Sequence, residues 1–166
     1  MPGPLDGIRI LDLSAVISGP FGTMILADQG ADVIKVEPPG RGDFTRSAGN
    51  KSGGLSASFL NNNRNKRSIT LDLKSPAGVD VVKRLAAISD VVVQNFRPGV
   101  VERLGVGEDE LRQVKPDIIY VSISGYGETG PFSDRPVYDP IIQALSGLAS
   151  IQGGSDEARP RLVRTI

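Results

Sequence analysis

Apolar residues in this chain gather in short runs, and the segments between the runs have helical spacing or are rich in turn residues. The runs are rich in β-branched residues and the first are nearly continuous, which is typical of parallel strands buried on both faces. This pattern predicts strands at residues 7–13, 31–37, 68–73, 90–93 and 118–123. Strands that alternate with helices imply right-handed crossovers. The sequence therefore predicts an α/β fold, with a parallel sheet covered by helices on both faces.

Capping residues and apolar spacing predict the helices. Ser75 and Pro76 suit the cap and the first position of a helix that runs to about residue 88. Pro20 suits the first position of an earlier helix, and Gly30 suits its C′ position, where φ must be positive. Further helical segments are predicted at residues 100–104, 109–114 and 140–150, whereas residues 38–65 are expected to be irregular.

The turn after the first strand is a candidate ligand site, because it presents backbone N–H groups at a helix N-terminus, which favours an anion. Residues 18–22 read Ser-Gly-Pro-Phe-Gly, which lacks the G-x-G-x-x-G fingerprint, and Pro20 removes one donor. A dinucleotide site with Glu37 as the ribose acceptor is therefore disfavoured. The chain has no G-x-x-x-x-G-K-[ST] motif, which excludes a P-loop within it.

Ligands of an open α/β sheet bind outside the carboxyl ends of the strands. The segments expected to meet there are residues 16–22, 38–41, 95–97 and 124–130. A ligand with several phosphates would bind basic side chains near this edge, although a solvated surface charge is the simpler interpretation of any single one. The basic residues near predicted strand ends and helix starts are Lys66, Arg67, Lys74, Arg97 and Arg103.

Composition removes several classes of function. The 166 residues include 19 basic and 19 acidic side chains, so net charge gives no argument for nucleic acid or a membrane surface. The chain has no cysteine and no histidine, so it supplies neither a thiol nucleophile nor a Ser-His-Asp triad, and we expect no metal centre. No apolar run approaches the ~18 residues of a membrane span, and no signal peptide is visible. We expect a cytoplasmic protein.

Two aspartates each have two interpretations. Asp12 lies among apolar strand residues and would need a partner if buried, which favours a structural hydrogen-bonding role over catalysis. Asp139 precedes Pro140 and is either the N-cap of the last helix or a carboxylate of the site, because the glycine-rich segment before it leads to this position.

Five segments occur in an order that points to one family. They read PLDGIRILDL from residue 4, SGP followed by LADQGADVIKVEPP, NKRSITLDLK from residue 65, VQNFRPG from residue 93 and SGYGETGP from residue 124. Together they resemble the N-terminal portion of a family III CoA-transferase of the CaiB/BaiF type. This group includes formyl-CoA transferases, carnitine CoA-transferases and alpha-methylacyl-CoA racemases. The resemblance covers essentially the whole chain.

The resemblance implies a Rossmann-like CoA-binding domain over residues 1–150, followed by the start of a linker over 151–166, in a protein more than twice this length. It implies an interlocked homodimer whose substrates are an acyl-CoA and a carboxylic acid acceptor. It also implies an aspartate that attacks the thioester and later carries CoA. In the family that aspartate follows a Pro-Arg-Leu-Val run, here residues 160–163, so we expect it beyond Ile166 and expect the isolated chain to be inactive.

By the same resemblance, Asp139 is expected to have a supporting catalytic role only. Some relatives have an arginine in place of Pro38 as an adenine-side contact, and Arg41 is a candidate substitute for it. The residues expected to contact coenzyme A are Ile17, Ser18, Leu71, Lys74, Asn95, Phe96, Arg97 and Arg103.

Two other functions stay open at this point. An acyl-CoA racemase of this group would use a histidine where this chain has Tyr138, so its two-base reaction would lack a partner. The other alternative is a non-catalytic CoA-binding module, complete at this length. The β-like run at residues 162–166 stops without a turn or cap, which argues against such a module.

Overall fold

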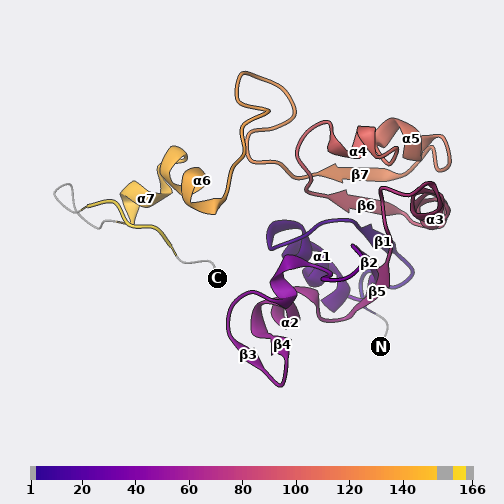
Figure 1. The fold of residues 1–166 in the computed structure, drawn as a ribbon, viewed down its shortest axis with the longest axis horizontal. Coiled ribbons are helices and arrows are strands. Elements are labelled where there is room, and N and C mark those ends of the chain that lie inside the picture. The colour runs from indigo at the N-terminus through magenta and orange to yellow at the C-terminus, as the bar shows by residue number, and fades with distance from the viewer. Residues whose placement is uncertain (1–2, 153–158, 164–166) are drawn as a thin grey trace. The chain divides into compact units, whose positions relative to one another are not determined.

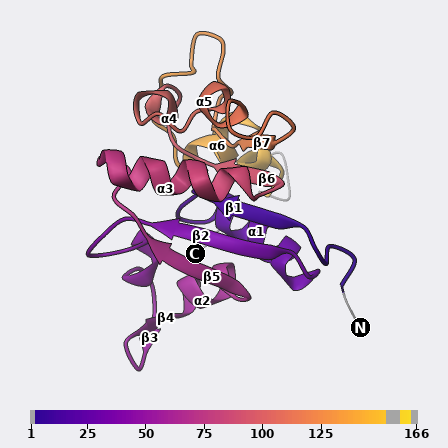
Figure 2. The same ribbon diagram turned by 90° about the vertical axis from the view of Figure 1, so that its right-hand side faces the viewer.

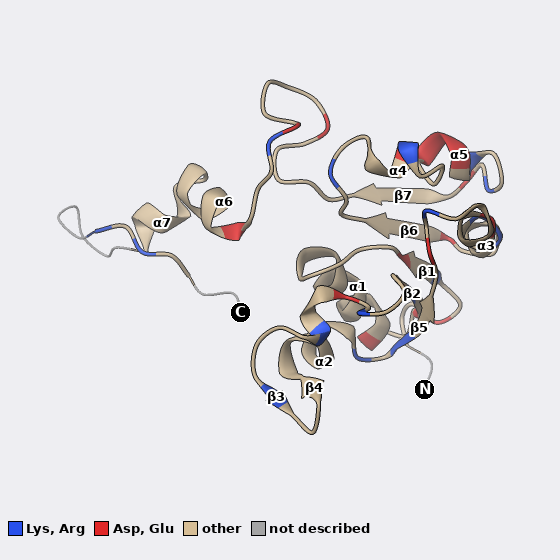
Figure 3. Ribbon diagram, viewed as in Figure 1, with Lys and Arg blue, Asp and Glu red and all other residues tan. Residues whose placement is uncertain are grey.

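A computed structural model describes residues 3–152 and 159–163 of the chain (Figure 1). The chain divides into two compact units, Met1–Ile123 and Ser124–Ile166, and the first contains the large sheet. Basic and acidic residues are interspersed along the elements of this first unit (Figure 3). The domain boundary expected at residue 150 stays a prediction.

The sheet of the first unit is entirely parallel, as the sequence pattern predicts. Its strand order is β5-β2-β1-β6-β7, so the first strand lies at the centre. In register, Leu11 of β1 lies opposite Ile34 of β2 and Val92 of β6, which gives a buried apolar row across the sheet. The strands are β1 (Arg9–Asp12), β2 (Asp32–Glu37), β5 (Lys66–Thr70), β6 (Val91–Gln94) and β7 (Ile119–Ser122).

Helices cover both faces of this sheet, which confirms the predicted architecture. On one face Val82 and Ala86 of α3 (Pro76–Ala87) and Leu111 of α5 (Glu108–Arg112) pack on Leu11 and Val92, together with α4 (Val100–Arg103). On the other face, Ala27 of α1 (Ser18–Asp28) packs on Ile10, Val33 and Val93. Figure 2 shows α3 and α1 on opposite sides of the strands.

The ends of α1 and α3 agree with the sequence except at one proline. Ser75 caps α3 by accepting a hydrogen bond from the Gly78 N–H, as expected. Gly30 follows α1 with φ of +103°, a conformation that glycine adopts without steric cost. Pro20, however, is the third residue of α1 rather than the first, because Ile17 occupies the N-cap position.

The segment expected to be irregular contains short ordered elements. These are η1 (Phe44–Arg46), the hairpin of β3 (Lys51–Ser52) with β4 (Leu55–Ser56), and α2 (Ala57–Asn63). Ser56 caps α2 by accepting a hydrogen bond from the Phe59 N–H at 3.3 Å, and α2 packs against α1. The polar, asparagine-rich sequence of α2 has no apolar face to signal a helix, so tertiary packing and the serine cap determine it.

The second unit contains α6 (Asp139–Leu145) and α7 (Leu148–Ile151). The single helix predicted over 140–150 is wrong, because Gly147 has φ of +82° and separates the two helices. The linker predicted over residues 151–166 falls partly outside the described residues. No helix in the described part of the chain is long and apolar enough to cross a membrane.

Candidate functional site

The loops that follow β1, β2 and β6 leave the same edge of the sheet and are joined by side chains. Asn95, after β6, accepts a hydrogen bond from the Ala15 N–H and donates one to the Ala15 carbonyl, both at 2.8 Å. Its amide nitrogen also lies 3.5 Å from the Ser18 hydroxyl oxygen. Asp43, after β2, accepts from the Val16 N–H at 3.3 Å. The expected meeting of these loops at the carboxyl edge is therefore confirmed, whereas residues 124–130 belong to the second unit.

Two buried ion pairs lie beneath the turn between β1 and α1. Lys35 of β2 pairs with Asp43 at 2.9 Å, and both side chains are 1% exposed. Lys66 pairs with Asp12 at 3.0 Å and is similarly buried. Sequence reasoning did not single out Lys35 or Asp43 as functional residues. The available signal was a lysine in the middle of an apolar strand, which needs a buried partner.

Asp12 and Lys66 form hydrogen bonds with each other and with neighbouring polar groups. Asp12 accepts hydrogen bonds from the Ser14 N–H and the Thr23 hydroxyl, which confirms its expected structural role. The Lys66 ammonium donates to Asp12, to the Pro20 carbonyl at 2.7 Å and to Asn63 at 2.9 Å, so its three donors are used. Burial lowers the pKa of Lys66, while the charge of Asp12 opposes this shift. Lys66 is therefore not a phosphate ligand.

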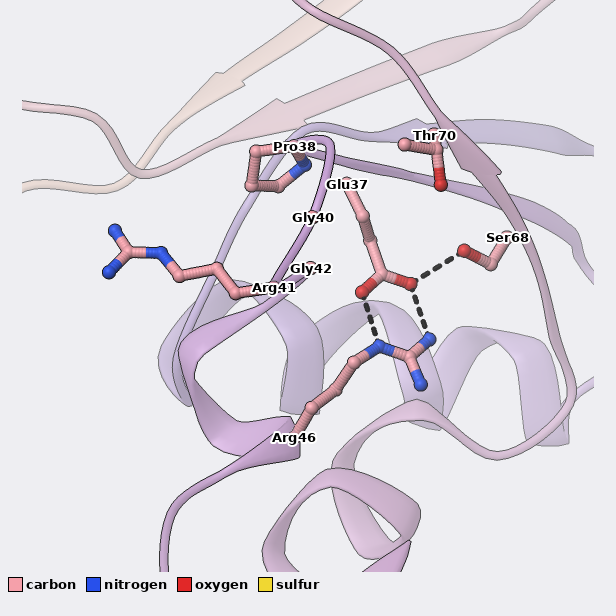
Figure 4. A pocket seen from close by; sticks show the side chains of 8 residues that line it. All are labelled: Glu37, Pro38, Gly40, Arg41, Gly42, Arg46, Ser68 and Thr70. Carbon is pink, nitrogen blue, oxygen red and sulfur yellow. Dashed lines mark hydrogen bonds and ion pairs between the residues drawn. The ribbon is translucent and has the colours of Figure 1, made fainter.

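Glu37, at the end of β2, is bound by three neighbours, of which Figure 4 shows Arg46 and Ser68. Its carboxylate accepts two hydrogen bonds from Arg46, both at 2.6 Å, one from the Ser68 hydroxyl and one from the Asp43 N–H. Both oxygens are thus occupied, which excludes the free ribose acceptor that a dinucleotide site needs.

A hollow of about 160 Å³ beside Glu37 is lined by Pro38 and Arg41. The Arg41 side chain extends away from Glu37, and its adenine contact stays a prediction.

The Glu37 interactions make stability depend on pH. Burial raises the pKa of Glu37, but the hydrogen bonds from Arg46, Ser68 and the Asp43 backbone outweigh it and lower the pKa from 4.5 to about 2. The stabilisation is complete above the unfolded-state pKa and is lost as pH falls from about 4.5 towards 2. In urea titrations across this range, wild type should lose stability more steeply than Glu37→Gln. Parallel losses in the two proteins would contradict this assignment.

A second hollow, of about 420 Å³, lies at the start of α3. Its lining combines two exposed cations, Lys74 and Arg103, with the apolar side chains of Leu73, Val79 and Leu104. A Cβ at Gly99 would lie 3.1 Å from the Arg103 guanidinium, so glycine lets this side chain lie against the backbone. The structure thus brings together two of the cations that the sequence selected, although they are 29 positions apart.

The other residues that we expected at the site from the sequence differ in how exposed their side chains are. Arg97 is exposed, and its side chain has no hydrogen-bond or ion-pair partner among the described residues. Phe96 and Leu71 are partly buried and pack against the core under α3, so their side chains also have a structural role. Arg67 pairs with Asp32 at the amino end of the strands, which removes it from the candidate site.

Asp139 lies in the second unit, as the first residue of α6, and accepts a hydrogen bond from the Gln143 side chain. The N-cap of α6 is Tyr138, so the N-cap interpretation of Asp139 is wrong. The supporting catalytic role stays a prediction. Among residues 3–152 and 159–163, no group of three or more acidic side chains is arranged to hold a metal ion.

Comparison with known sequences finds a matching family model and several related proteins. The model of CoA-transferase family III matches residues 5–166. The succinyl-CoA:glutarate CoA-transferase of Mus musculus is 51% identical over 98% of this chain and 38% of its own length. The acetyl-CoA:oxalate CoA-transferase of Acetobacter aceti is 47% identical over 93% of this chain and 40% of its own length. The chain thus spans about two fifths of the length of these relatives.

Solved structures give the same result. A CaiB/BaiF family protein from Brucella suis superposes with a TM-score of 0.92 at 39% identity, covering 98% of this chain and 44% of that one. The protein Rv3272 from Mycobacterium tuberculosis superposes with a TM-score of 0.87 at 39% identity, covering 98% of this chain and 45% of that one.

Proposed function

Because the chain belongs to CoA-transferase family III, we propose that it forms the CoA-binding N-terminal part of an enzyme that moves coenzyme A from an acyl-CoA to a carboxylic acid. The observation that carries the proposal is the position of Lys74 and Arg103 on one hollow. A second support is the turn between β1 and α1, which lies at the edge of the sheet where ligands of α/β proteins bind.

The chemistry of these residues matches that of coenzyme A. Its phosphates carry several negative charges, which favours exposed cations such as Lys74, Arg97 and Arg103. The apolar lining of the hollow suits the adenine ring or the pantetheine arm. The thioester end is proposed to lie at Ile17 and Ser18, where the N-terminus of α1 favours developing negative charge.

The proposed reaction proceeds through an enzyme aspartate beyond Ile166. Its carboxylate attacks the thioester carbonyl, expels CoA thiolate and forms a mixed anhydride. The thiolate attacks the aspartyl carbonyl of the anhydride and releases the acyl group as a carboxylate, which leaves an aspartyl-CoA thioester. The acceptor carboxylate attacks this thioester and expels the thiolate again. The thiolate then attacks the acceptor carbonyl, which releases the new acyl-CoA and restores the aspartate.

Dicarboxylic acids are the proposed substrate class. The relatives at 51% and 47% identity are named for succinyl-CoA with glutarate and for oxalate, and others at 44–46% identity are named for citramalate, glutarate and malate. Tyr138 in place of a histidine weighs against a two-base racemase. The interlocked homodimer and the cytoplasmic location stay predictions.

A transferase assay on the full-length protein tests the proposal. With succinyl-CoA as donor and glutarate, oxalate or malate as acceptor, we expect the acceptor's CoA thioester to appear on chromatography. In deuterated water, a 2-methylacyl-CoA should keep its α-hydrogen. Deuterium at the α-carbon without CoA transfer would instead support a racemase. The chain of residues 1–166 alone should bind CoA but transfer none.

A further inference from the structure

The turn between β1 and α1 has a conformation that its own sequence does not favour. Val16 has φ of +70°, in the left-handed region. A β-branched residue is rarely found there, because its side chain clashes with the backbone. Such a conformation persists only where the surrounding structure fixes it, and it is most often found at functional sites.

Side chains from three separate segments bind the backbone of this turn. Asn95 binds both the N–H and the carbonyl of Ala15, each at 2.8 Å. Lys35 donates to the Ser14 carbonyl at 2.8 Å. Asp43 accepts from the Val16 N–H at 3.3 Å. We call these three side chains, Lys35, Asp43 and Asn95, the turn cluster.

The members of the turn cluster are themselves fixed in place. Lys35 and Asp43 form the buried ion pair at 2.9 Å. The Asp43 carboxylate also accepts hydrogen bonds from the N–H and the hydroxyl of Thr45, at 2.9 and 2.7 Å, and its own N–H donates to Glu37. Because every partner is buried or partly buried, the turn cluster can impose a costly conformation on Val16.

We infer that Asn95 and Asp43 are positioning residues, which fix Val16 in the left-handed conformation and so direct Ile17, Ser18 and the first turn of α1 towards the ligand. The Asn95 side-chain amide holds the turn from both sides of one peptide group, since its oxygen and its nitrogen both bind Ala15. This inference rests on the proposed function for the identity of the ligand, but not for the role of the turn cluster.

A double-mutant cycle between residues 16 and 95 tests the inference. Glycine tolerates positive φ, so Val16→Gly removes the conformational cost that the turn cluster opposes. In the full-length protein, Asn95→Ala should weaken CoA binding about tenfold when residue 16 is valine, and less than about threefold when it is glycine. A side chain that contacts CoA directly, or that is needed only for folding, would give equal losses in the two backgrounds. Equal losses would overturn the inference.

Hydrogen exchange without ligand separates this inference from the proposed function. In Asn95→Ala, the protection factor of the residue 16 amide should fall about tenfold when residue 16 is valine. It should fall less in the Val16→Gly background, because the unstrained amide keeps its bond to Asp43. If the wild-type protein does not bind CoA, the proposed function fails, but the protection factors still decide the role of the turn cluster.

In Asp43→Asn, the fall in the protection factor should depend in the same way on whether residue 16 is valine or glycine. If the charge of unpaired Lys35 unfolds that variant, the Asn95 cycle decides.

Discussion

Asp12→Ala is expected to destabilise the fold by about 3–5 kcal/mol, as is typical when one partner of a buried ion pair is removed. Asp12 is completely buried and accepts hydrogen bonds from Ser14, Thr23 and Lys66. Alanine would leave the Lys66 ammonium in the interior without a counter-charge, and would leave the Ser14 N–H without its acceptor. Urea denaturation followed by circular dichroism measures the loss.

Two further variants separate charge burial from a general effect of substitution. Asp117→Ala removes an aspartate whose side chain is 75% exposed, although it pairs with Lys115 at 2.8 Å, and should leave stability unchanged. Asp12→Ala combined with Lys66→Met should recover part of the loss, because neither charge of this pair then stays buried. Equal stability of Asp12→Ala and wild type, or no recovery in the double variant, would contradict this account of the pair.

Removal of the cations beside the second hollow is expected to weaken ligand binding strongly. Lys74→Ala and Arg103→Ala should each weaken CoA binding about tenfold, the scale of a hydrogen bond between charged groups. Arg97→Ala should have a similar effect, because this exposed guanidinium has no partner among the described residues. Calorimetric titration of CoA into the full-length protein measures each change, and added salt should weaken wild-type binding more than that of the variants.

Arg84→Ala is the matched control for these variants. Arg84 is an exposed residue in the last turn of α3, outside the residues that line the hollow. Its removal changes the net charge as Arg103→Ala does, so a general electrostatic attraction would be weakened equally by both. If Arg84→Ala and Arg103→Ala lower the affinity to the same extent, the hollow is not the phosphate site.

Local sequence signals were enough to predict most of the first unit. The β-branched runs around Leu11 and Val92 predict the strands, and Ser75 with Pro76 predicts the start of α3, because capping depends on adjacent residues. Gly147 shows the limit of this approach, since helical spacing continues across it while its backbone does not. Similarly, β5 ends at Thr70, whereas the alternating pattern predicts a strand that continues to residue 73.

Non-local partners explain what the sequence did not show at the site. Lys35 and Asp43 lie on successive segments of the chain, but nothing in residues 38–65 indicates that Asp43 turns inwards. Asn95 was selected by resemblance as a CoA contact, which stays a prediction, and the sequence did not show that its side chain binds a backbone group 80 positions earlier. The grouping of Lys74 with Arg103 likewise depends on how α3 and α4 pack, and spacing along the chain does not determine this.

Coenzyme A is proposed to bind at the carboxyl edge of this sheet, between the turn that precedes α1 and the hollow beside α3. Hydrogen exchange of the full-length protein with and without CoA tests this proposal most directly, because it reports both binding and position. The account predicts that CoA slows exchange at residues 16–19, 73–79 and 95–104, with little change in α2. No protection at any of these segments, or protection confined to residues 38–63, would contradict it.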